Sequence, residues 1–321
     1  MRTGLTLAAG ILAGLWIDTA RRSARAEREH PPTGGFVNAD GVHLHVLDQG
    51  RGAPVVFIHG AGTWSEDFEI AGLMDEAAGR WRAIAIDRPG CGYSDRPWGA
   101  GSPQTQADIL HAGVARLNAS RPILVGHSFG GAVALAYALQ YPDEVGGVVF
   151  VSGYAFPTPR ADFVPFMAPA IPGVGQVLSR TVAQPIDRAL LPALLRRVFA
   201  PAPVPAAYWE RADMLLRPGQ LEASASDIAA LIPAARALSA RYGELTCPLA
   251  IIAGDEDRIL DPRAQAARLH EAVPGSTLHM LAGAGHMPHH ARPEAVIAAI
   301  ERVMRASQIE RAYEQQQAAG E

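Results

Sequence analysis

The chain has 321 residues, of which 49% are hydrophobic and 19% are charged, a composition typical of an ordered globular protein. Its formal net charge is −4 and it has no basic stripe, so we expect no nucleic-acid partner. All 28 basic residues are arginine, and without a lysine amine the chain cannot be a Schiff-base, pyridoxal-phosphate or Walker-type phosphate-binding enzyme. The two cysteines, Cys91 and Cys247, show no zinc-ligand spacing, so no metal is expected.

The amino terminus contains an uncharged apolar segment at residues 4–17, with Arg2 before it and Asp18 and several arginines after it. As a helix this segment would reach about 21 Å, short of the roughly 30 Å hydrocarbon core of a bilayer unless flanking side chains snorkel. We predict an uncleaved anchor that associates the protein with a membrane through residues 4–17. The alternatives are a cleaved signal, which would mean export, and a helix that rests on another surface.

Residues 18–35 are polar and rich in arginine, so the sequence predicts that residues 1–35 form an apolar segment and a linker ahead of the folded core. A hairpin turning at Asp40-Gly41 follows. Apolar runs of strand type then alternate with helical patterns, which is typical of a parallel sheet with helices on both faces. The expected strands are residues 36–38, 42–47, 54–58, 82–86, 123–125, 145–151, 249–253 and 277–281.

This alternation breaks between residues 154 and 245, a proline-rich segment with short helical patterns and no strand-type run. We interpret residues 154–245 as a helical cap inserted into an α/β core, which comprises residues 36–153 and 246–306. A polar tail at residues 307–321 completes the predicted organisation.

The stretch VGHSFGG, residues 125–131, lies between a strand-type run and a helical pattern. Its serine, Ser128, has a glycine two positions away on each side. A serine hydroxyl is a weak nucleophile by itself. Acyl transfer also needs a base, a carboxylate that orients the base, and two donors for the oxyanion. In a parallel sheet these groups should emerge at the carboxyl ends of strands.

His286 is the first histidine after the strand at residues 277–281, with His289 and His290 as nearby rivals. The strand at residues 249–253 leads into GDEDRIL, which offers three acids as the carboxylate and does not choose among them: Asp255, Glu256 and Asp257.

The amide of Phe129 lies at a helix start, where backbone N–H groups are unpaired and can bind an oxyanion. A second donor could come from the loop after residues 54–58, which contains Gly60, Ala61 and Gly62.

The nucleophile, the acid and the base follow one another in this order along the chain, each directly after a strand. This arrangement matches that of the α/β-hydrolase fold, in which the serine lies in a nucleophile elbow. The chain resembles a capped, serine-nucleophile, esterase- or lipase-like member of that superfamily over residues 36–305. The motifs that carry the resemblance are His59-Gly60, the run from Asp87 to Ser94, Gly126 to Gly130, Gly254 to Asp257, and Gly285-His286. The resemblance implies an α/β fold with a mostly parallel eight-stranded sheet, helices on both faces and an inserted helical cap.

The resemblance also selects Asp257 as the acid and implies that the amides of Ala61 and Phe129 form the oxyanion hole. His59 would brace the oxyanion loop. Serine at the elbow disfavours epoxide hydrolases and haloalkane dehalogenases, whose nucleophile is an aspartate.

We therefore expect a carboxylesterase-like serine hydrolase that cleaves a small-molecule carboxylic ester, or a related acyl compound, through an acyl-enzyme formed by Ser128, His286 and Asp257. The mechanism requires no cofactor and no metal. Amide, lactone and carbon–carbon bond substrates remain open, as does a catalytically silent scaffold that senses a ligand.

Overall fold

The computed structural model describes residues 2–159 and 167–320. Its centre is one eight-stranded sheet with the order β1-β2-β4-β3-β5-β6-β7-β8. β2 pairs antiparallel with β1 and β4, and the remaining neighbours are parallel, which confirms the predicted mostly parallel sheet. The strands are β1 (Gly35–Ala39), β2 (Val42–Gly50), β3 (Pro54–Ile58), β4 (Arg82–Ile86), β5 (Ile123–His127), β6 (Gly147–Val151), β7 (Leu249–Gly254) and β8 (Thr277–Leu281).

Helices connect these strands and flank the sheet. Their bounds are α1 (Arg2–Glu29), α2 (Glu66–Ile70), α3 (Leu73–Ala78), α4 (Pro103–Arg116), α5 (Phe129–Gln140), α6 (Val174–Arg180), α7 (Ala183–Phe199), α8 (Ala206–Glu210), α9 (Ala212–Leu215), α10 (Pro218–Ser239), α11 (Arg268–Ala272), α12 (Pro288–Ala291) and α13 (Pro293–Gly320). α4 shows why such helices start where they do: the Ser102 hydroxyl accepts the Thr105 amide, and Pro103 occupies the first turn.

Helices cover both faces of the sheet. In β3, Val56 and Ile58 pack into the cluster that contains α4 and α5, whereas Val55 and Phe57 pack into the cluster that contains α3 and α13. The central strands are therefore buried on both sides, which explains why they read as unbroken apolar runs in the sequence.

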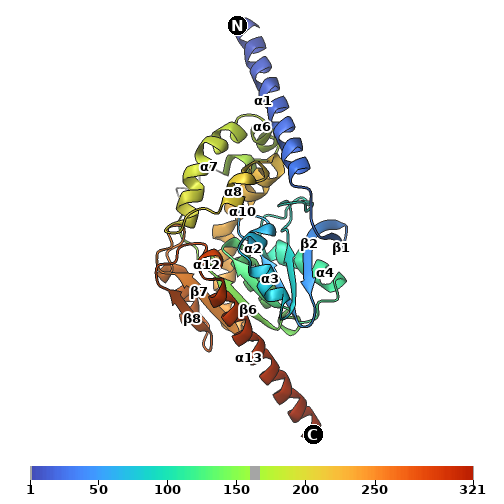
Figure 1. Ribbon diagram of the computed structural model, residues 1–321, viewed down its shortest axis with the longest axis vertical. Helices are drawn as coiled ribbons and strands as arrows, with labels where there is room; N and C mark the ends of the chain where they lie inside the picture. Colours follow the sequence, from blue (N-terminus) through green and yellow to red (C-terminus); the bar gives the residue numbers. More distant parts are fainter. Residues whose placement is uncertain (1, 160–166, 321) are drawn as a thin grey trace.

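The helices α6 to α10 follow β6 in the chain and lie between α1 and the sheet (Figure 1). A third apolar cluster joins them to the core, because Trp64 and Met287 of the core pack against Leu191 and Phe199 of α7 and Tyr208 of α8. These helices therefore lie over the carboxyl ends of the parallel strands.

The amino-terminal helix differs from the prediction in two respects. α1 continues through the expected linker to Glu29, because residues 18–29 contain neither proline nor glycine and two charged pairs, Asp18 with Arg22 and Arg25 with Glu29, support the helical turn. Of the helices in the described residues, none combines the length and the apolar content that crossing a bilayer requires. The predicted membrane anchor, and with it a membrane localisation and association through residues 4–17, is wrong.

The second half of α1 is instead tied to the body of the protein. Glu27 forms an ion pair with Arg217 at 3.0 Å, Ala26 is buried, and the Arg180 guanidinium lies 5.7 Å from the centre of the Trp16 ring. Figure 1 shows the other half of α1 extending beyond the body, next to α6.

The turn between β5 and α5 depends on very close backbone packing. A Cβ atom on Gly130 would lie 2.0 Å from the carbonyl oxygen of Ile58, and one on Gly126 would lie 2.3 Å from the carbonyl oxygen of Gly130. Only glycine therefore allows β3, β5 and the start of α5 to approach this closely.

We predict that Gly130→Ala lowers the free energy of unfolding by about 3 kcal/mol, because the added methyl group overpacks against the end of β3. The matched control is Gly219→Ala in α10, where an added Cβ meets nothing within 4 Å. That variant should stay within about 1 kcal/mol of wild type. Urea unfolding measures both, and equal midpoints for the two variants would contradict the packing argument.

Candidate active site

The carboxyl edge of the sheet brings three predicted side chains into one hydrogen-bonded chain. Ser128 directly follows β5, Asp257 follows β7 and His286 follows β8. His286 Nε2 lies 3.0 Å from Ser128 Oγ, and His286 Nδ1 lies 2.8 Å from Asp257 Oδ2. The side chains of His286 and Asp257 are 4% and 2% exposed, so little solvent screens the pair.

Ser128 has a backbone conformation that serine rarely adopts, with φ 53° and ψ −117°. Neighbouring backbone groups hold it there: its amide donates to Val151 at 3.0 Å, and its carbonyl accepts from Tyr154 at 3.1 Å. Left-handed backbone of this kind costs roughly 1–3 kcal/mol in a non-glycine residue and persists only where the surroundings enforce it. Here it directs the hydroxyl out of the turn and toward His286.

Asp257, not its neighbours, is the acid that meets the histidine. Its Oδ1 accepts the amides of Ile259 and Leu260 at 2.7 and 2.9 Å, which leaves Oδ2 for His286. Asp255 is exposed and accepts the Gly283 amide instead. The carboxylate is therefore held by two backbone donors in the orientation that the imidazole requires.

The rival histidines, His289 and His290, are turned to a different carboxylate. Their Nε2 atoms lie 2.9 and 2.7 Å from the two oxygens of Asp67, and the Tyr208 hydroxyl donates to the same group. The two histidines hold the pKa of Asp67 well below its usual range despite burial, and burial lowers the pKa of His289. Because Asp67 lies 222 residues from His289, no local sequence pattern points to this cluster.

Asp67, His289 and His290 are also the described residues that come closest to a metal site, with ligand atoms within 4.8 Å of one another. The donor set would suit a divalent transition metal. However, both Nε2 atoms and both carboxylate oxygens are already engaged in hydrogen bonds inside the cluster. The geometry is that of a buried ion-pair network.

His127 contacts His286 through a hydrogen bond and through its ring. Its Nε2–H donates to the backbone carbonyl of His286 at 2.9 Å, and the two rings lie 5.0 Å apart. Burial holds the pKa of His127 well below its usual range, so the ring is neutral. A neutral neighbour adds no charge next to His286.

The two amides predicted to bind an oxyanion, those of Ala61 and Phe129, come from loops brought together by strand register. Ile58 at the end of β3 is paired with Gly126 in β5, so the loop after β3 lies beside the start of α5. Ala61 and Phe129 line the same cavity as Ser128. In the described part of the chain neither amide has a hydrogen-bond acceptor.

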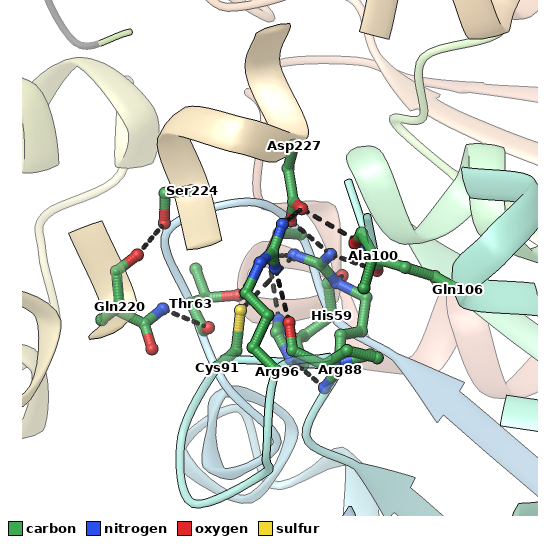
Figure 2. Close-up of polar contacts among 12 residues, drawn as sticks. His59, Thr63, Arg88, Cys91, Arg96, Ala100, Gln106, Gln220, Ser224 and Asp227 are labelled. Carbon is green, nitrogen blue, oxygen red and sulfur yellow. Dashed lines mark hydrogen bonds and ion pairs between the residues drawn. The ribbon is translucent and has the colours of Figure 1, made fainter. Parts of the chain in front are cut away.

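A buried arginine holds the loop that carries Ala61. Arg88 Nε donates to the carbonyl of His59 and Nη2 donates to the carbonyl of Gly60, both at 2.8 Å. The guanidinium also lies 4.6 Å from the centre of the Phe129 ring. Figure 2 shows Arg88 and His59 at the centre of this network. One fully buried cation thus touches both segments that present the unpaired amides.

His59 has a single tautomer that fits its surroundings. Its Nε2 accepts the backbone amide of Arg88 at 2.9 Å, and its Nδ1–H donates to the carbonyl of Gly60 at 2.8 Å. Burial, with a smaller contribution from the Arg88 charge, lowers the pKa of His59 to about 3. The ring is therefore neutral, and its two hydrogen bonds join the backbone of Arg88 to that of Gly60.

Arg88 also forms hydrogen bonds with α10, one of the helices between β6 and β7. Arg88 Nη1 donates to Asp227 of α10 at 2.6 Å, and Arg96 and Gln106 donate to the other oxygen of that carboxylate (Figure 2). Gln220 of α10 donates to the carbonyl of Thr63 at 2.9 Å. No local sequence pattern could identify Asp227 as a partner of Arg88, because the two residues lie 139 positions apart.

A cavity of about 200 Å³ opens at Ser128 and His286. Its lining is mostly aliphatic and comes largely from α7 and α10, and it holds one carboxylate, Asp187, among the described residues. Such a site suits a small or medium apolar ligand.

Comparison with known proteins gives the same fold. A family model described as the alpha/beta hydrolase fold matches residues 53–293. A 2-hydroxy-6-oxo-2,4-heptadienoate hydrolase of Pseudomonas putida is 30% identical over 270 residues, which cover 79% of this chain and 89% of that protein.

Two solved structures have a fold similar to that of this chain. A thermophilic esterase from Thermogutta terrifontis matches 85% of this chain and 98% of its own, with a TM-score of 0.66 and 24% identity. An enol-lactonase from Burkholderia xenovorans LB400 matches 84% of this chain and 99% of its own, with a TM-score of 0.67 and 23% identity. With its sheet order, its strand-to-helix turn at a serine and this family match, the chain belongs to the alpha/beta-hydrolase family and is an enzyme, a hydrolase.

Proposed function

We propose that this hydrolase cleaves carboxylic esters through an acyl-enzyme, with Ser128 as nucleophile, His286 as base and Asp257 as the group that orients the base. The observation that carries the proposal is the unbroken hydrogen-bonded chain from Asp257 through His286 to Ser128, which ends in an apolar cavity. Activation of a serine hydroxyl requires a base that can take its proton and an acid that orients the base. The contacts of His286 with Ser128 and with Asp257 meet these two requirements.

In the first half-reaction Ser128 Oγ attacks the ester carbonyl while His286 Nε2 takes its proton. The carbonyl oxygen becomes an oxyanion, and the amides of Ala61 and Phe129 donate to it. The tetrahedral species then collapses: the ester C–O bond breaks, and His286 gives its proton to the departing alkoxide. The products of this step are a free alcohol and an acyl group on Ser128.

In the second half-reaction water replaces the alcohol. His286 takes a proton from water, the hydroxide attacks the acyl carbonyl, and the same two amides stabilise the second oxyanion. Collapse breaks the bond to Ser128 Oγ, which recovers its proton from His286. Asp257 accepts the hydrogen bond from Nδ1–H of His286 and so holds the tautomer in which Nε2 is free to accept at the start of each cycle.

The predicted division of the chain fits this chemistry. In the proposal, residues 36–153 and 246–306 supply the reacting groups, and the cap at residues 154–245 supplies most of the wall that the substrate chain contacts. Support comes from the cavity lining, in which Leu191, Leu194 and Leu221 belong to α7 and α10. Amide, lactone and carbon–carbon bond substrates would use the same first step, and the cavity favours an ester with a mainly apolar chain because few polar groups line it.

We predict that Ser128→Ala lowers kcat for p-nitrophenyl esters by about 10⁴-fold or more, because no other group can form the acyl-enzyme. The control is Ser152→Ala, which removes another buried serine hydroxyl at the end of the neighbouring strand, β6. It should retain activity within a few-fold of wild type. A series from acetate to decanoate would also give the chain length that the cavity prefers.

The ester proposal would be wrong if wild type were folded and hydrolysed no member of the series. It would also be wrong if Ser128→Ala were as active as Ser152→Ala. In the first case amide and lactone substrates, and then the silent scaffold, would become the leading interpretations.

The oxyanion loop depends on a neutral His59, and this makes stability depend on pH. Between about pH 3 and pH 6.5 the unfolded chain binds a proton at His59 that the folded chain does not, so stability falls as pH falls below about 6.5. The contribution reaches about 1.4 kcal/mol per pH unit. Urea unfolding between neutral pH and pH 5 should show a smaller slope for His59→Gln than for wild type.

Nuclear magnetic resonance gives a second readout that needs no variant to fold. The imidazole resonances of His59 should not titrate above pH 5. Titration near pH 6.5, or identical slopes for wild type and His59→Gln, would contradict the neutral tautomer.

A further inference from the structure

Asp187 is a carboxylate in an otherwise aliphatic wall of the cavity. It lies in the second turn of α7 and lines the cavity together with Leu190, Leu191 and Leu194 of the same helix. These positions follow at helical spacing, so Asp187 and the leucines share one face of α7. No feature of the proposed mechanism uses this carboxylate.

Within residues 2–159 and 167–320, Asp187 has no hydrogen-bond or ion-pair partner, although arginines are close in the chain. Arg188 pairs with Asp213, and Arg180 pairs with Glu222 at 2.5 Å. Burial raises the pKa of Asp187 to about 6, and no charge among the described residues opposes this shift. Within the described ranges this half-buried carboxyl group therefore has no partner, and it faces the cavity.

The position of Asp187 relative to Ser128 is set by the direction of α7. The other end of the helix is near the reacting groups, because Val198 and Phe199 belong to the apolar cluster of Met287, the residue after His286. An α-helix rises about 1.5 Å per residue, so Asp187 lies roughly 16 Å along α7 from Val198. A substrate chain that extends from Ser128 along the leucines would bring its far end toward the carboxylate.

We propose that Asp187 is a specificity-determining residue that binds a hydrogen-bond donor, a hydroxyl or an ammonium group, at the distal end of the substrate's carbon chain. The preferred substrates are then medium-chain esters with an ω-hydroxyl or ω-ammonium group, not unsubstituted alkyl esters. This inference rests on the proposed ester hydrolysis for the position of the ester group, and on the cavity alone for the recognition of the donor.

Physical chemistry favours such a preference strongly. An alkyl end would remove water from Asp187 and offer no hydrogen bond in return, whereas a hydroxyl or ammonium group replaces that water. Sites that hydrogen-bond a substrate group reject the analogue that lacks it, because their own polar group is then left unpaired. A hydrogen bond to a charged group corresponds to about ten- to a hundredfold in affinity.

The test begins with binding, so that it does not depend on turnover. In the Ser128→Ala chain, calorimetry compares octanamide, decanamide and dodecanamide with the same amides bearing an ω-hydroxyl or an ω-ammonium group. We expect the ω-substituted ligands to bind about ten- to a hundredfold more tightly at the best length. Adding Asp187→Leu should abolish or reverse this ratio. Adding Glu210→Gln, which removes an exposed carboxylate in α8 outside the cavity, should leave it unchanged.

Asp187→Asn separates the two donor types. An amide oxygen still accepts from a hydroxyl, so the preference for ω-hydroxyl ligands should largely remain, while the preference for ω-ammonium ligands should be lost with the charge. The same ligand pairs as p-nitrophenyl esters, tested on the chain with Ser128 intact, should show the matching ratio in kcat/KM.

The inference is overturned if the ratio of ω-substituted to alkyl ligands is the same with Asp187 and with Asp187→Leu. It is also overturned if Asp187→Leu lowers the melting temperature and weakens all ligands equally, since that is the behaviour of a structural residue. Failure of the proposed function looks different: the binding preference is present and depends on Asp187, but no ester is hydrolysed.

Discussion

The structure depends on the contact between three backbone segments at the turn after β5. Gly126 and Gly130 have no side chain at the point where the turn meets the end of β3, so the carbonyl of Ile58 can lie where a Cβ atom would otherwise be. That contact lies where α5 begins, and beside it the backbone hydrogen bonds of Ser128 to Val151 and Tyr154 hold its left-handed conformation. It also places the loop after β3 beside the first amide of α5. The proposed nucleophile and both proposed oxyanion donors are therefore consequences of one close approach.

A buried charge connects this turn to the helices above it. Arg88 is fully buried, and its guanidinium donates to the loop that carries Ala61, to Gln106 of α4 and to Asp227 of α10. Burying an arginine is costly unless its donors are satisfied, and removing one partner from a buried pair costs about 3–5 kcal/mol. The position of α10, which contributes to the cavity wall, is thereby linked to the position of the loop that carries the Ala61 amide.

Much of the proposed site could be predicted from the sequence because its signals are local. The glycines around Ser128, the strand before His286 and the acidic turn after β7 each lie within a few residues of the group they position. The choice of Asp257 over Asp255 needed the family resemblance, and the structure gives the physical reason: Asp255 is occupied by the Gly283 amide.

Other features depend on contacts between residues far apart in the chain, and the sequence could not supply them. In the sequence Asp227 is one acid in a helical pattern, and only the fold brings Arg88 close enough to donate to it. Asp67 likewise contacts His289 and His290 only in the folded chain. The predicted membrane anchor failed for a related reason. Residues 4–17 are apolar, but they form the first half of one helix whose polar second half is tied to the body of the protein by the ion pair of Glu27 with Arg217.

The most direct test of the account is to map a covalent adduct. The protein would be treated with an alkyl fluorophosphonate, and the modified residue would be identified by peptide mass spectrometry in wild type and in His286→Asn. We expect one adduct per chain, located on Ser128, whose rate of formation falls by orders of magnitude in His286→Asn. An adduct on another residue, or labelling of Ser128 at equal rates in both proteins, would show that His286 does not activate Ser128.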